Sequence, residues 1–148
     1  MNRQFVVFPL ADELYGIDIQ QVMRIEKMLP LTRVPNAPPF VIGVCNLRGR
    51  VVPVIDLKRR LALPSRPNEN AKIIISSIGS KVVGMTIDST VDVSTIQTEE
   101  IEPSPALVTG IDTQFIQGVA KLSNRLLIIL DVERILSVDQ LNVLNDMG

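Results

Sequence analysis

The stretch GVCNLRGRVVPVIDLKRRLAL, residues 43–63, recurs without a gap as GVAKLSNRLLIILDVERILSV, residues 118–138. The two copies lie 75 positions apart and share seven identical residues. A similar match relates FVVFPLADELYGIDI, residues 5–19, to IIISSIGSKVVGMTI, residues 73–87, because each is an apolar run, a polar turn and a second apolar run. The chain therefore consists of two copies of one unit.

Short apolar runs separated by turn residues predict about ten short strands in two similar sets. Gly49 lies at a turn that needs a positive φ, and Asn124 occupies the same turn in the second copy. Asn tolerates the left-handed region best after Gly, so we expect a turn in both copies. Such strand sets predict an all-β fold of two closed or nearly closed small barrels, because closure leaves few unpaired edges.

Four further segments predict three helices and a boundary. Ile19, Val22 and Ile25 recur every three residues, which favours one helical turn. Asp56 ends a strand and can cap a short helix over residues 57–61. Apolar residues after Asp131 predict an amphipathic C-terminal helix. The polar, proline-containing stretch 64–70 is the best candidate boundary between the copies.

Length and composition limit the class of protein. The 148 residues are 46% hydrophobic, which is enough for one compact domain or two tightly joined sub-domains. A net charge of -1 gives no overall electrostatic reason to bind nucleic acid or an anionic membrane. The apolar runs are shorter than the roughly 18 residues that span a bilayer, and no signal peptide is apparent. We expect a cytoplasmic protein without direct membrane insertion.

Missing residue types argue against catalysis. The chain has no histidine, one cysteine and no glycine-rich phosphate loop, so we expect no enzyme activity, no cofactor and no metal site. Cys45 lies in an apolar run, where a small buried side chain is the simpler interpretation. The adjacent acids at 12–13 and 99–100 lie in polar turns or loops, where solvated surface is the usual role.

The string GVCNLRGRVVPVIDL, residues 43–57, preceded by RVPNAPPFVIG at 33–43, resembles the CheW family of bacterial chemotaxis coupling proteins. The likeness includes ELYGIDI at 13–19, KVVGMTID at 81–88 and the later NRLLIILDVERIL, and thus covers nearly the whole chain. The motif NLRG…PVIDL is long and specific.

The resemblance implies one CheW-like domain over residues 1–148, built from two similar five-stranded β-barrels of SH3- or OB-like type on a shared hydrophobic core. The expected sub-domains are residues 1–66 for the first barrel and 67–148 for the second barrel with the C-terminal helix. The second copy has Ser123 where the first has Arg48, so only the first half carries the full signature.

The resemblance also implies a non-catalytic adaptor, recruited to membrane-bound receptor arrays, that couples transmembrane chemoreceptors to the histidine kinase CheA. The expected partners are the cytoplasmic tip of the receptors and the CheW-like regulatory domain of the kinase. The residues carried over by position as partner-binding are Ile19, Val22, Ile25, Gly43, Asn46, Leu47, Arg48, Gly49 and Val91. Relatives often have an acidic or apolar residue where this chain has Arg24, which bears on a partner contact there.

Each candidate also has a structural explanation. From the sequence pattern by itself, Arg48 is an ordinary solvated arginine in a turn. The resemblance instead favours a partner contact or a hydrogen bond between loops. Regularly spaced Ile19, Val22 and Ile25 read as barrel core, and at least one must be exposed if they bind a partner. We predict that Val22 lines a partner surface and keeps its solvent contact, because it lies among polar residues on a turn that cannot hide every side chain, so Val22→Asp should affect binding more than stability.

Two other functions remain open. The basic residues Lys58, Arg59 and Arg60, near Arg48 and Arg50, raise the possibility of single-stranded nucleic-acid binding by a small barrel. With Trp 0, Tyr 1 and Phe 4, however, the chain has few aromatic side chains on which bases could stack, and we expect no nucleic-acid partner. The other alternative is a free-standing CheW-like regulatory module of a different signalling pathway.

Overall fold

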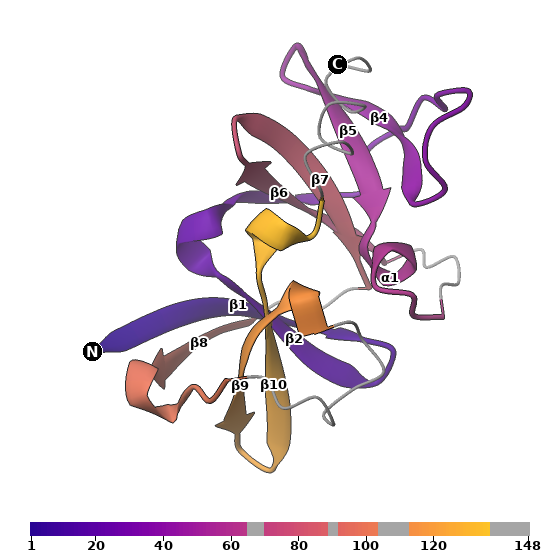
Figure 1. The fold of residues 1–148 in the computed structure, drawn as a ribbon. Coiled ribbons are helices and arrows are strands. Elements are labelled where there is room, and N and C mark those ends of the chain that lie inside the picture. The colour runs from indigo at the N-terminus through magenta and orange to yellow at the C-terminus, as the bar shows by residue number, and fades with distance from the viewer. Residues whose placement is uncertain (65–69, 89–91, 104–112, 137–148) are drawn as a thin grey trace.

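A computed structural model describes residues 1–64, 70–88, 92–103 and 113–136. Over these residues the chain forms ten strands and five short helical segments (Figure 1). The strands are β1 (Asn2–Leu10), β2 (Glu13–Asp18), β3 (Val22–Lys27), β4 (Val41–Leu47), β5 (Arg50–Asp56), β6 (Lys72–Ile78), β7 (Lys81–Ile87), β8 (Asp92–Gln97), β9 (Ile116–Leu122) and β10 (Arg125–Leu130). The helical segments are η1 (Ile19–Gln21), α1 (Leu57–Arg60), η2 (Thr98–Glu100), η3 (Thr113–Phe115) and η4 (Val132–Arg134), of which only α1 is α-helical.

The strands form two five-stranded sheets, and each sheet takes strands from both copies of the repeat. The first sheet has the order β8-β1-β2-β10-β9 and the second the order β3-β6-β7-β5-β4. Each hairpin, β1–β2 or β6–β7, is therefore flanked by three strands of the other copy. The expected division into a barrel of residues 1–66 and one of 67–148 does not describe these sheets, because β3 to β5 join the second sheet and β8 to β10 join the first.

The two copies repeat this exchange with the same register. Ile129 pairs in parallel with Gly16 in the first sheet, and Val54 pairs in parallel with Gly84 in the second. A Cβ at Gly84 would lie 2.8 Å from Cγ2 of Ile73, and one at Gly16 would lie 3.2 Å from a leucine side chain of β10. The absence of a side chain at both glycines thus lets the neighbouring apolar side chains pack close to the backbone.

One additional bridge nearly closes each sheet. In the second sheet, the segment after β3 pairs with β4, where Thr32 and Val44 exchange two backbone hydrogen bonds of 2.8 Å. In the first sheet, the segment after β8 pairs with β9, where Glu102 and Val119 exchange two bonds of 2.9 Å. These bridges join opposite edges of each sheet, which agrees with the nearly closed barrels predicted from the sequence.

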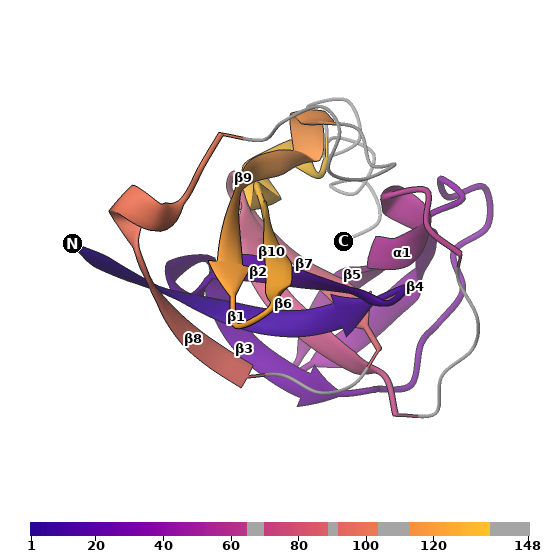
Figure 2. The same ribbon diagram turned by 90° about the horizontal axis from the view of Figure 1, so that it is seen from below.

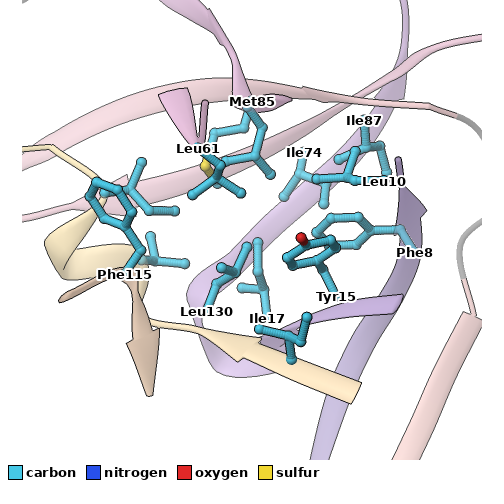
Figure 3. Close-up of a cluster of buried hydrophobic side chains, with 14 of the residues drawn as sticks. Phe8, Leu10, Tyr15, Ile17, Leu61, Ile74, Met85, Ile87, Phe115 and Leu130 are labelled. Carbon is cyan, nitrogen blue, oxygen red and sulfur yellow. The ribbon is translucent and has the colours of Figure 1, made fainter. Parts of the chain in front are cut away.

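Apolar side chains fill three cores. A large one, the shared core, lies between the sheets (Figure 3) and includes Val6, Phe8, Leu10, Tyr15, Ile17, Ile55, Leu57, Ile74, Met85, Ile87, Phe115 and Leu130. Each sheet also encloses an inner core on its other face. Phe5, Val7, Ile96, Ala120, Leu127 and Ile129 form that of the first sheet, and Cys45, Val52, Val54, Ile73 and Ile75 form that of the second. The predicted shared core is confirmed.

The helical turn predicted from Ile19, Val22 and Ile25 is only partly present. The first of these residues begins the single 3₁₀ turn η1, whereas Val22 and Ile25 lie on strand β3. A bulge in β3 explains the misleading spacing, because Val22 pairs with Ser76 and Ile25 pairs with Ile74 across a register shift. The extra residue turns positions three apart toward the same face of the sheet.

The helix predicted after Asp56 is confirmed. Its carboxylate accepts hydrogen bonds from the backbone N–H groups of Lys58 and Arg59 at the start of α1. Asp131 caps η4 in the second copy by accepting from the N–H of Glu133. The remainder of the predicted C-terminal helix, residues 137–148, lies outside the described residues, as do residues 65–69 of the predicted boundary.

Arg60 joins the two copies at the shared core. Its guanidinium carbon lies 5.3 Å from the ring centroid of Phe40 and 4.7 Å from that of Phe115, which are equivalent positions of the repeat. Its Nε donates to the backbone carbonyl of Ile135, the residue that is equivalent to Arg60 itself. A single side chain of the first copy therefore contacts three structural elements, two of them from the second copy.

Two buried hydroxyl groups in the described part of the chain make no hydrogen bond: Tyr15 Oη and Ser76 Oγ. Both side chains have no exposed surface. Burial, with a smaller contribution from the charge of Glu13, raises the pKa of Tyr15 to about 12. An unpaired buried hydroxyl loses its hydration without compensation, so these two groups reduce the stability of the fold.

Strand exchange makes the halves interdependent. We expect separately produced fragments 1–66 and 67–148 to show no cooperative thermal transition alone, since each would lack strands from both sheets, and to recover one when mixed. Cleavage of the folded chain at a protease site inserted between residues 64 and 70 is the control, and should leave the transition nearly intact. A fragment that melts cooperatively by itself, close to the temperature of the whole chain, contradicts this expectation.

Replacing Tyr15 with Phe removes an unpaired hydroxyl, so the variant should gain about 1 kcal/mol in free energy of unfolding. The folded pKa of Tyr15 lies above its unfolded value near 10. Between pH 10 and pH 12 the Tyr15 hydroxyl ionises in the unfolded chain but not in the folded one, so the free energy of unfolding of the parent should fall over this range. The Tyr15→Phe variant should not show this fall. Denaturant unfolding measures both. Since the chain has one tyrosine, tyrosinate absorbance of the folded protein reports Tyr15 directly, and a midpoint near the ordinary value excludes this account.

Candidate functional site

Eight of the nine candidate residues lie on or directly beside two parts of the second sheet. Ile19, Val22 and Ile25 lie on η1 and β3, and the signature residues lie on β4 and its turn to β5. In the strand order β3 and β4 are opposite edges of one sheet. Val91, the ninth candidate, lies outside the described residues.

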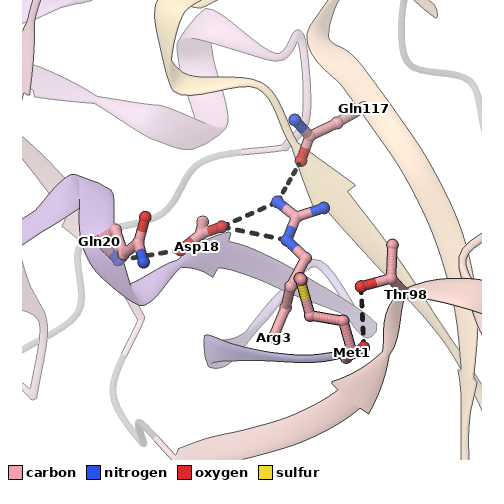
Figure 4. Close-up of polar contacts among 6 residues, drawn as sticks. All are labelled: Met1, Arg3, Asp18, Gln20, Thr98 and Gln117. Atoms are coloured by element: carbon pink, nitrogen blue, oxygen red, sulfur yellow. Dashed lines mark hydrogen bonds and ion pairs between the residues drawn. The ribbon is translucent and has the colours of Figure 1, made fainter.

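A polar network fixes the start of the first part (Figure 4). Asp18 Oδ1 accepts from the backbone N–H of Gln20 at 2.9 Å and so caps η1. Its Oδ2 accepts from Arg3 Nη2 at 2.8 Å and Nε at 3.3 Å, and Arg3 Nη2 also donates to Gln117 Oε1 at 3.2 Å. This network ties β1, β2 and β9 to the turn that leads into β3. Sequence reasoning missed it, although an Asp directly before a polar turn is a recognisable cap.

The candidates on η1 and β3 differ in exposure. Ile19 and Val22 are partly buried and pack against the shared core, so Val22 keeps only part of its contact with solvent. Ile25 is 38% exposed, and its neighbour Met23 is 54% exposed. The condition that at least one of the three candidates be exposed is therefore met by Ile25. Sequence reasoning missed Met23, since the predicted helical turn gave that position no role.

Apolar residues on both edge strands extend the shared core to the surface. Ile25 on β3 pairs with Ile74, and Val93 on β8 pairs with Val6, and both partners belong to the shared core. Directly opposed residues of antiparallel strands lie on the same face, so Ile25 and Val93 lie on the face toward that core. Val93 is 54% exposed. We call Val22, Ile25 and Val93 the core margin.

The signature turn has a strained backbone. Leu47 pairs with Arg50, so Arg48 and Gly49 form a two-residue hairpin loop, with φ values of 53° and 84°. The side chain of Asn46 holds the loop by accepting from the N–H of Gly49 at 2.8 Å. In the second copy the positive φ falls on Ser123, at 57°, rather than on Asn124. Both copies form the expected turn with a positive φ at the equivalent positions Arg48 and Ser123, but Asn124 does not take the positive φ of its equivalent, Gly49.

Most of the signature residues shape the backbone. Gly43 is buried, and a Cβ there would lie 2.7 Å from the carbonyl oxygen of Thr32, at the bridge that closes the sheet. Leu47 packs against the inner core of the second sheet. Arg48 is exposed, and its side chain makes no hydrogen bond or ion pair among the described residues. The expected hydrogen bond between loops is thus not observed, and Arg48 is the signature side chain that is available to a partner.

Arg24 is engaged locally. Its Nε lies 2.9 Å from Glu26 Oε1, and the two residues lie two positions apart on β3. Both pair with residues of the inner core of the second sheet, Ile75 and Ile73, and so lie on the opposite face from Ile25. Arg24 therefore does not belong to the core margin.

The basic run of α1 is mostly committed to the fold. Lys58 is buried and forms an ion pair with Asp88, and Arg60 lies between two phenylalanine rings. Of the three, Arg59 is the most exposed, with 56% of its side chain accessible. The cluster that raised the nucleic-acid alternative therefore offers much less free positive charge than its sequence indicates.

The described residues offer little for catalysis. Cys45 is buried, as predicted, and burial together with the charge of Glu26 raises the pKa of its thiol, which disfavours the nucleophilic thiolate. In the same ranges, no three acidic or cysteine side chains come together as metal ligands would. No helix within the described ranges is long and apolar enough to cross a membrane.

Comparison with known proteins places the fold in a family. Residues 4–140 match the model of the CheW-like domain. The chemotaxis protein CheW of Klebsiella aerogenes is 35% identical over 100% of this chain and 90% of that protein, and that of Bacillus subtilis is 40% identical over 91% and 87%. The crystal structure of scaffolding protein TtCheW from Thermoanaerobacter tengcongensis superposes with a TM-score of 0.86, at 39% identity over 95% of this chain and 91% of that one. This chain therefore belongs to the CheW family of chemotaxis scaffold proteins.

Proposed function

We propose that this chain is a non-catalytic adaptor that couples transmembrane chemoreceptors to the histidine kinase CheA at cytoplasmic receptor arrays. The observation that carries the proposal is the family match across residues 4–140, which includes both sheets. The partners in this proposal are the cytoplasmic tip of the receptors and the CheW-like regulatory domain of the kinase.

The core margin is suited to a helical partner. Ile25 and Val93 are exposed apolar residues on two edge strands, and each pairs with a residue of the shared core. An amphipathic helix binds through apolar anchors that enter such a surface, and a few anchors supply most of the affinity. We assign a receptor helix to this margin, in the same proposal.

The Arg48 turn is suited to a polar contact. Its side chain is exposed and unpaired in the described structure, and the side chain of Asn46 holds the loop by accepting from the N–H of Gly49. A guanidinium can bind a carboxylate through two parallel hydrogen bonds. The Arg48 turn is therefore the second candidate partner contact in the proposal. It follows the end of β4, which is an edge strand of the second sheet.

A reconstituted kinase assay tests the proposed coupling. We expect the protein to increase CheA autophosphorylation only when receptor cytoplasmic fragments are present, and to have no effect on CheA alone. The control is the same mixture with the chain heat-unfolded. If the folded chain does not change kinase output with receptor present, the coupling role is wrong, and the alternative of a CheW-like module from another pathway is favoured.

Substitution at Ile25 tests the core margin. Ile25→Asp places a charge on an exposed anchor, so the melting temperature should change little while binding to a receptor fragment weakens by about 2 kcal/mol. Leu126→Asp is the matched control, because Leu126 is an exposed strand residue of similar accessibility, 44%, on β10. It should leave binding unchanged.

Val22→Asp should behave differently, because it places a carboxylate against the shared core and should lower the free energy of unfolding by several kcal/mol. Thermal denaturation and a pull-down on the same preparations measure both effects. An Ile25→Asp protein that is folded and binds normally shows that the margin is not the receptor surface.

A further inference from the structure

A pocket of about 530 Å³ lies where the proline-rich segment before β4 faces α1. Its walls include Pro35, Pro38, Pro39 and Ile42, and its two charged residues are Arg33 and Arg59. No carboxylate is among the residues that line it. The pocket thus combines a positive charge with an apolar wall.

Both arginines have donors available. Arg33 is exposed and has no hydrogen bond or ion pair within the described residues. Arg59 has one ion pair, in which its Nε lies 3.5 Å from Asp56 Oδ2. The other oxygen of that carboxylate accepts from two backbone N–H groups of α1, and no contact described for Arg59 uses its two Nη groups. Two guanidinium groups at one pocket favour an anion.

The walls limit the kind of anion. Sites for phosphate use several backbone N–H donors that point at the ligand. Pro35, Pro38 and Pro39 have no N–H, and the N–H of Val41 already donates to the carbonyl of Pro38 at 2.9 Å. Three prolines without an N–H and the side chain of Ile42 give the pocket an apolar wall beside its two guanidinium groups, so it fits a carboxylate with an aliphatic stem better than a free phosphate.

We propose that this pocket binds the carboxylate of an acidic side chain, with an adjacent apolar side chain, in an extended segment of a partner protein. The guanidinium groups of Arg33 and Arg59 bind the carboxylate oxygens, and the proline-rich wall contacts the apolar neighbour. The volume lies within the range of ordinary ligand pockets, about 300–1,000 Å³, and accommodates these two side chains.

Comparison of the two copies supports a specific site. Arg134 is the repeat equivalent of Arg59 and has the same ion pair with its capping aspartate, Asp131, at 3.4 Å. The equivalent of Arg33, however, is Pro103, by the alignment that matches Thr32 with Glu102. The pair of guanidinium groups therefore exists only in the first copy, and the capping geometry alone does not account for it.

The pocket is separate from the surfaces assigned above. It lies at the beginning of β4, and the Arg48 turn follows the end of that strand. Seven residues of strand separate them by about 20 Å. The acidic segment therefore binds independently of the proposed coupling function, and its test requires neither kinase nor receptor.

The probe is a capped pentapeptide of alternating leucine and glutamate, titrated into the whole ¹⁵N-labelled chain and followed by NMR. We expect amide signals of Arg33, Val34, Val41, Ile42 and Arg59 to shift, and the matched glutamine peptide to bind at least about tenfold more weakly. Arg33→Ala and Arg59→Ala should each weaken binding about tenfold, whereas Arg134→Ala should bind as the parent does. Thermal melts of the three variants confirm that each is folded.

Three results would overturn the proposal. Equal binding of the glutamine peptide would show that the carboxylate is not recognised. If Arg134→Ala weakened peptide binding as much as Arg33→Ala and Arg59→Ala do, the overall positive charge of the protein, and not the pocket, would attract the peptide. Inorganic phosphate that gives the same shifts at the same concentration as the glutamate peptide would show a simple anion site without selectivity for an acidic segment.

Discussion

The parallel pairings of β10 with β2 and of β5 with β7 hold each hairpin against strands from the other copy of the repeat. These pairings exist because Gly16 and Gly84 leave room beside them for leucine, isoleucine and valine side chains. From them follow the shared core between the sheets, the edge positions of β3 and β8 (Figure 2), and the closing bridges at Thr32 and Glu102. The core margin is a direct result, because an edge strand leaves one side of its core-facing residues uncovered.

The signature of the family separates into backbone and contact roles. Gly43 admits the Thr32 carbonyl, Asn46 holds the turn, and Gly49 adopts a positive φ without strain. Arg48 has a positive φ despite its side chain, a conformation that costs about 1 kcal/mol or more for a non-glycine residue. Ser123 has the same conformation at the equivalent turn of the second copy, so this backbone geometry belongs to the hairpin turn, and the contact role of Arg48 rests on its exposed side chain.

The sequence predicted local structure well and long-range pairing poorly. The repeat, the hairpin turns and the Asp56 cap depend on neighbouring residues, and each was visible in the sequence. The exchange of strands between the copies was not visible in the sequence. Two similar units have the same apolar pattern whether each forms its own sheet or both contribute strands to each sheet. The β3 bulge hid that strand, since it gave Val22 and Ile25 a helical spacing. The pocket depends on Arg33 and Arg59 meeting across 26 positions, for which no local pattern exists.

The exchange of strands between the two repeat copies resembles the arrangement of a twofold-symmetric dimer whose two subunits have been joined in one chain. A single unit could complete its sheets only by pairing with an identical second unit. Every residue near the twofold axis would then have to pack against the same residue of the other unit. Joining the units in one chain removes that requirement. Phe8 and Tyr15 pair in the first sheet where Ser76 and Val83 pair in the second, and Arg60 stands opposite Ile135. With both units in one chain, equivalent positions can hold side chains of different size, such as the pair Phe8 and Tyr15 against the smaller pair Ser76 and Val83. An arginine such as Arg60 can likewise be present in one copy only.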